Sequence, residues 1–121
     1  MKVKIDTKEK FHVITIDDSV LPANMTANME ETLLPFLNNS TKNIIINFSN
    51  IKKIDESVAN VLVSIQQTFY DSNSSMVICN MPPEIETYLD EKELLELMNV
   101  TPTESEAWDI VQMEEIEREF N

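Results

Sequence analysis

The chain has 121 residues, a formal net charge of −13 and a hydrophobic content of 42%, values typical of a soluble globular protein with one core. We therefore expect a single domain over residues 1–121. No apolar run approaches the roughly 20 residues that a membrane-spanning helix needs, and the first ten residues are too charged for a signal peptide. Cys79 is the only cysteine, so we expect a cytoplasmic protein in which this thiol is a buried apolar group.

The acidic residues are concentrated near the C-terminus, because residues 84–121 hold 13 of the 22 acids and only Lys92 and Arg118 as bases. Binding to nucleic acid or insertion into a membrane is not expected without a basic patch or an apolar span. We interpret the acids as solvated helix faces rather than a docking site. The chain has no glycine, which excludes glycine-rich phosphate loops and leaves turns to Asn, Asp, Ser and Pro.

The first half of the sequence alternates strand and helix patterns. Residues 2–6 and 12–16 each alternate polar and apolar positions, which predicts an N-terminal hairpin. A helix is expected over residues 25–34, capped by Asn24 and disturbed near its end by Pro35. Residues 43–48 contain three successive isoleucines, which favours a strand covered on both faces.

The segment after this strand predicts a helix that begins at Asp55, a residue type whose carboxylate accepts the free amides of a first turn. Ser57 is then the second helical residue and faces solvent, at a point where free amides and the helix dipole would stabilise a phosphate. On the local pattern alone, Ser57 is a tolerated polar residue; a switch position is the alternative. Helical spacing gives this helix an apolar face and a polar face. The apolar face consists of Val58, Val61, Leu62, Ile65 and Phe69, and the polar face of Ser57, Asn60, Ser64, Gln67 and Asp71.

The C-terminal third continues the alternation. We expect a strand at residues 76–79, a helix opened by Pro82 and Pro83, and a short helical turn followed by a strand near residues 97–100. Residues 103–106 have capping-box spacing and predict a last helix, with an extension at residues 112–121. For Ile116 and Phe120 in that extension we favour simple packing, and leave contact with a partner or a homodimer as the alternative.

Together these elements predict an α/β fold with a central, mixed and partly parallel sheet of about five strands, an N-terminal antiparallel hairpin and about four helices. Catalysis is not expected, because the sole histidine, His12, lies on a predicted strand with no partner for a serine nucleophile. No metal site is expected either, since one His and one Cys lack ligand spacing. Nothing in the sequence indicates a cofactor.

Three segments resemble STAS domains, the family of bacterial anti-sigma factor antagonists. They are residues 44–57, which end in Asp55-Glu56-Ser57, residues 80–85, and residues 104–107. The likeness covers roughly residues 3–111 and implies a STAS-like fold. It also implies partner switching, in which the antagonist binds an anti-sigma factor that is also a serine kinase, and phosphorylation breaks that complex.

In the family the turn into the second long helix reads Asp-Ser-Ser-Gly, and its second serine is phosphorylated. Asp55 and Ser57 match this motif, while Glu56 and Val58 depart from it. The loop over residues 17–24 would form the neighbouring docking surface, with Pro22 where many members carry an aspartate. The resemblance thus implies phosphorylation at Ser57 and a partner-binding surface of Leu21, Asn24, Asp55, Glu56, Ser57, Asn60 and Ser64. The alternative is a STAS scaffold or accessory subunit of a transport or signalling assembly that works without phosphorylation.

Overall fold

The computed structural model describes residues 1–120, so Asn121, the last residue of the expected extension, lies outside the described residues. Its main sheet has five strands in the order β1-β2-β4-β6-β7. β1 and β2 are antiparallel, and the remaining neighbours are parallel. The strands are β1 (Val3–Thr7), β2 (His12–Ile16), β4 (Ile44–Asn47), β6 (Met76–Cys79) and β7 (Val100–Thr101). The predicted mixed sheet with its N-terminal hairpin is confirmed.

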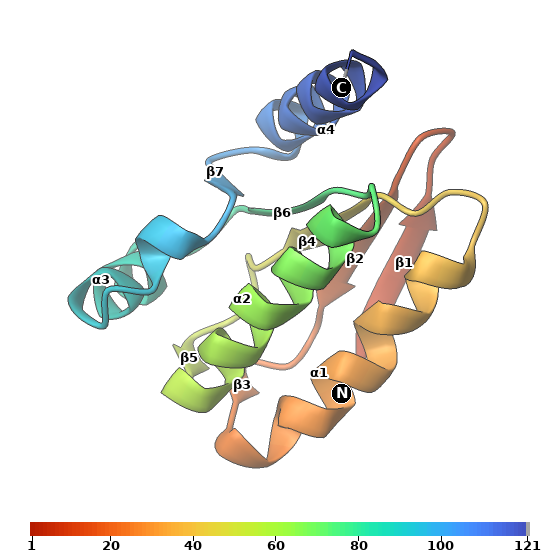
Figure 1. Ribbon diagram of the computed structural model, residues 1–121. Coiled ribbons are helices and arrows are strands. Elements are labelled where there is room, and N and C mark those ends of the chain that lie inside the picture. The colour runs from red at the N-terminus through yellow and green to blue at the C-terminus, as the bar shows by residue number, and fades with distance from the viewer. Residues whose placement is uncertain (121) are drawn as a thin grey trace.

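Helices cover both faces of this sheet. Over residues 1–120, the α-helices are α1 (Thr26–Leu33), α2 (Glu56–Asp71), α3 (Pro83–Glu91) and α4 (Glu104–Glu119). α1 and α2 lie side by side over one face, and α4 packs against β4, β6 and β7 (Figure 1). Short 3₁₀ turns complete the chain: η1 (Ala23–Met25), η2 (Leu34–Asn38) and η3 (Leu95–Leu97).

The three isoleucines of β4 explain the layering. Ile44 and Ile46 point into the larger core under α1 and α2, whereas Ile45 points into a second cluster under α4. All three side chains are fully buried, as expected for a central parallel strand. Cys79 belongs to the second cluster, and its burial, with a smaller effect of the Glu104 carboxylate, raises the thiol pKa to about 11. The expectation of a buried, apolar Cys79 is confirmed.

Three details differ from the sequence prediction. Asn24 does not cap α1, because it lies within the turn η1, and α1 begins at Thr26 without a side-chain cap. The last strand lies at Val100–Thr101, slightly beyond the expected position. Simple packing is wrong for Ile116 and Phe120, whose side chains are 54% and 83% exposed.

A second, two-stranded sheet was not expected from the sequence. β3 (Val20–Leu21) and β5 (Lys53–Ile54) pair in parallel. Because this pairing joins segments about thirty residues apart, it fixes the loop after β2 against the residues that precede α2. None of the helices described over residues 1–120 is long and apolar enough to cross a membrane.

Candidate functional site

The candidate site is the N-terminus of α2. Asp55 has an extended backbone, with φ −76° and ψ 147°, and is the N-cap residue as predicted. Its Oδ2 accepts a hydrogen bond from the Ser57 backbone N–H at 2.9 Å. The Ser57 hydroxyl donates a second hydrogen bond to the same oxygen. One carboxylate oxygen therefore fixes both the first turn of the helix and the rotamer of Ser57.

These two hydrogen bonds set the ionisation of the cap. The Ser57 hydroxyl and then the Ser57 backbone N–H stabilise the charged carboxylate, so the pKa of Asp55 lies below its ordinary value. Asp55 is therefore ionised at neutral pH, where its charge also interacts favourably with the positive end of the α2 dipole.

Ser57 itself is half-buried rather than fully exposed, and its two neighbours differ sharply in environment. The next residue, Val58, is fully buried in the larger core, whereas Glu56 is exposed. The hydroxyl thus lies at the boundary between core and solvent, and the expectation of a solvent-facing position is met only in part. Phosphorylation of Ser57 would replace the hydroxyl hydrogen and so remove the hydrogen bond that it donates to Asp55.

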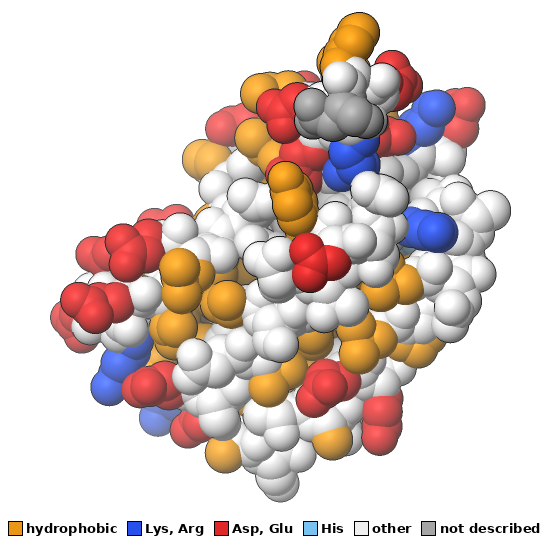
Figure 2. Space-filling model, in the orientation of Figure 1, with side chains coloured by type: hydrophobic (Ala, Val, Ile, Leu, Met, Phe, Trp, Pro, Cys, Tyr) orange, Lys and Arg blue, Asp and Glu red, His pale blue; other side chains and the backbone are white. Residues whose placement is uncertain are grey.

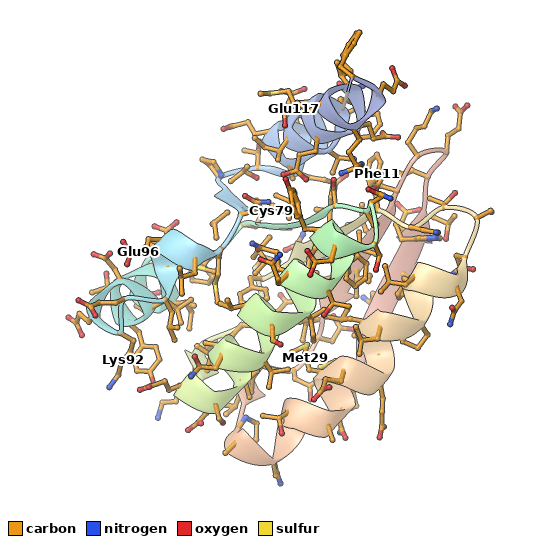
Figure 3. All side chains as sticks on the ribbon, in the orientation of Figure 1. Phe11, Met29, Cys79, Lys92, Glu96 and Glu117 are labelled. Carbon is orange, nitrogen blue, oxygen red and sulfur yellow. The ribbon has the colours of Figure 1, made fainter. Side chains whose placement is uncertain are left out.

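A lysine from α3 reaches the site. Lys92 Nζ lies 3.4 Å from Glu56 Oε1 and 5.7 Å from the centre of the Tyr88 ring. Figure 3 shows Lys92 at the end of α3, on the side of the molecule where α2 begins. The sequence alone does not predict that Lys92 belongs to this site. The only available signal was its isolation as a base within a strongly acidic segment.

The segment from β3 to η1 forms the neighbouring part of the surface. The Asp55 backbone N–H donates to the Leu21 carbonyl oxygen at 2.9 Å, which ties the start of α2 to β3. Asn24 is exposed on η1, and η1 packs against α2. On α2, Asn60 and Ser64 are also exposed, one and two turns beyond Glu56.

The structure excludes Leu21 from this surface. Its side chain is fully buried in the larger core, so the prediction that Leu21 contacts a partner is wrong for the side chain. The reason is the two-residue strand β3: alternation turns Val20 outward and Leu21 inward. The remaining predicted residues, Asn24, Asp55, Glu56, Ser57, Asn60 and Ser64, do lie on adjoining elements.

The mixed five-stranded sheet with an antiparallel hairpin at one edge, covered by helices, matches the fold of the anti-sigma factor antagonist SpoIIAA. The chain belongs to the STAS domain family, because the model of that family matches residues 2–107. No curated protein sequence matches the chain.

Three solved structures illustrate the similarity of fold. RsbS from Moorella thermoacetica is 21% identical, with a TM-score of 0.74 over 93% of this chain and 96% of that one. A candidate anti-sigma factor antagonist from Thermotoga maritima is 19% identical, with a TM-score of 0.74 over 91% and 94%. The anti-sigma factor antagonist SpoIIAA in its unphosphorylated form is 17% identical, with a TM-score of 0.69 over 92% and 96%.

Proposed function

We propose that this protein is a cytoplasmic partner-switching regulator of the anti-sigma factor antagonist type. It binds a serine kinase that acts as an anti-sigma factor, and phosphorylation of Ser57 breaks the complex. The observation that supports this most is the position of Ser57, the second residue of α2, beside the exposed Glu56 and one helical turn before the exposed Asn60. The family relationship adds support, since SpoIIAA has been solved in phosphorylated and unphosphorylated forms.

The charge change explains how such a switch works. A phosphate adds about −1.5 to −2 charges at neutral pH, beside the carboxylates of Asp55 and Glu56. The helix dipole and the free amides of the first turn stabilise the added phosphate in the isolated protein. In a complex, the same charge must be desolvated against the partner, which weakens a close interface.

The direct test is incubation of the purified protein with the cognate kinase and ATP, followed by mass spectrometry of the modified peptide. We expect phosphate on Ser57 and none on a Ser57→Ala variant. In a binding assay with the same kinase, Ser57→Glu should weaken the complex about tenfold or more.

Ser105→Glu is the matched control, because Ser105 is the exposed second residue of α4, a helix of the same 16-residue length as α2 on the other face of the sheet. It should bind the kinase as the unmodified protein does. Equal loss of binding in both variants, or phosphate on another residue only, would contradict the proposal.

A STAS scaffold that works without phosphorylation is the second candidate. The observations that favour it are the half-buried Ser57 hydroxyl held by Asp55 and the ion pair that Lys92 makes with Glu56. A domain of similar fold also occurs within the murine anion transporter Slc26a9, with a TM-score of 0.68, 14% identity and coverage of 86% of this chain but 18% of that one. Full activity of Ser57→Ala and of Ser57→Glu in cells would support this alternative.

A further inference from the structure

β1 is an edge strand whose outer side is unpaired among the residues that the structure describes. Two backbone hydrogen bonds, Lys8 N–H to the Phe11 oxygen and Asp17 N–H to the Lys2 oxygen, fix which residues of this strand bond to β2. Because bonded and non-bonded positions alternate in an antiparallel pair, Lys4 and Asp6 bond inward. The N–H and C=O groups of Val3, Ile5 and Thr7 therefore point away from the sheet.

The same edge exposes an apolar side chain at its middle. Ile5 is 52% exposed, and it lies opposite Ile14 on the sheet face that carries α1 and α2. A row of free backbone groups with a central apolar side chain is a template for another extended strand. Lys4 and Asp6 point to the other face of the sheet.

This edge is complementary to itself. In an antiparallel pair of two copies of β1 about a two-fold axis at Ile5, the two Ile5 residues are opposite each other and Val3 is opposite the second copy's Thr7. Lys4 is then directly opposite the second copy's Asp6, and the symmetry repeats this contact. We propose that two copies of this chain pair through their β1 edges in this register and so form one continuous sheet.

At the two-fold axis the charges favour this register over its two neighbours, although the register with Lys4 opposite Lys4 also places Lys2 opposite the second copy's Asp6. Slippage by one pairing step in one direction places Lys4 opposite the second copy's Lys4, and in the other direction Asp6 opposite Asp6; like charges directly opposite are unfavourable. The central register leaves two symmetry-related like-charge contacts, each between Lys2 of one copy and Lys8 of the other. They lie beyond the strand ends, and Lys8 Nζ is already 2.9 Å from Asp6 Oδ2 in its own chain.

The overall charge distribution also favours this edge. The first ten residues carry four lysines and two acids, whereas residues 84–121 carry 13 acids and two bases. α3 and β7 lie at the opposite side of the sheet from β1 (Figure 1), and acidic side chains gather over α3 and α4 (Figure 2). Association through β1 therefore joins the two copies at their least acidic edge and keeps the acidic helices apart.

The test is sedimentation velocity over a range of concentrations with charge-reversal variants. We expect the unmodified protein to dimerise in a concentration-dependent manner, and Lys4→Asp and Asp6→Lys each to weaken dimerisation about tenfold or more. An equimolar mixture of the two variants should restore a dimer. In a mixed pair, both contacts between positions 4 and 6 join an aspartate of one variant to a lysine of the other.

The control is Lys42→Asp, which makes the same charge change at an exposed lysine before β4 and should dimerise as the unmodified protein does. Circular dichroism confirms that each variant is folded. A monomeric unmodified protein at about millimolar concentration, or a mixture that stays monomeric, would overturn the proposal. The β1 edge and the Ser57 surface belong to different elements, so phosphorylation of Ser57 should be the same in all of these variants.

Discussion

At the scale of single residues, the cap of α2 is the most informative feature. Asp55 was predicted as the N-cap from its residue type and its position before an amphipathic pattern, and the structure confirms it. The hydrogen bond between the Ser57 hydroxyl and Asp55 was not predictable, because a serine hydroxyl has several rotamers and the sequence alone does not fix which one it adopts. The Asp55 carboxylate thus stabilises the start of α2 and also accepts a hydrogen bond from the Ser57 hydroxyl, the group that we propose is phosphorylated.

The lowered pKa of Asp55 predicts a pH-dependent stability. A carboxyl group whose folded pKa is below its unfolded value, about 3.9, stabilises the fold above that value and loses this contribution as pH falls through the folded pKa. Asp55→Asn keeps a capping oxygen but does not titrate. We expect the unmodified protein to have the higher melting temperature at pH 7, with the difference shrinking below about pH 4. Thermal denaturation followed by circular dichroism across this range measures it; a constant difference would contradict the assignment.

At the scale of elements, the absence of glycine has a cost in the turns that follow helices and strands. Asn73, Asn80 and Glu93 have positive φ values of 60°, 56° and 61°. Asparagine tolerates this left-handed region of backbone conformation, which agrees with the expectation that the turns of a glycine-free chain use Asn, Asp, Ser and Pro. Glutamate does not readily adopt positive φ, yet Glu93 has this left-handed conformation directly after α3. The Leu94 N–H there donates a hydrogen bond to the Leu89 carbonyl oxygen at 2.9 Å, which closes the end of the helix.

This geometry predicts a stabilising substitution. Glu93→Gly should raise the free energy of unfolding by roughly 0.5–1 kcal/mol, because glycine adopts positive φ without the steric cost of a Cβ atom. Glu86→Gly is the matched control: it removes the same charge from an exposed position inside α3 and should lower the free energy of unfolding by about 1 kcal/mol. Urea denaturation of the three proteins separates the two effects, and a destabilised Glu93→Gly would show that the backbone there is not strained.

The elements that periodicity reveals were predictable, and those that depend on distant pairing were not. β4 is indicated by three successive isoleucines and α2 by a repeated apolar face. β3 and β5 are two residues each, too short for an alternating pattern, and exist only because they pair with each other. For the same reason the candidate site at Ser57 could be predicted from the helical pattern, while the burial of Leu21 and the approach of Lys92 required the tertiary structure.

At the scale of the whole molecule, the two faces of the sheet are covered unequally. α1, α2 and α3 bury the larger cluster, whereas α4 alone buries the smaller one, chiefly through Ala107 and Val111. The family model ends at residue 107, but α4 continues to Glu119. The match to the family model therefore ends within the first turns of α4.

The outer face of α4 predicts which of its apolar residues stabilise the fold. Met113, Ile116 and Phe120 recur at helical spacing on the side opposite Val111, and they are 55%, 54% and 83% exposed. Val111 is fully buried, so Val111→Ala should lower the free energy of unfolding by about 2 kcal/mol. Ile116→Ala should change it by less than about 0.5 kcal/mol. Urea denaturation of both variants at a fixed protein concentration tests this contrast, and a large loss in Ile116→Ala would mean that the outer face is covered in solution.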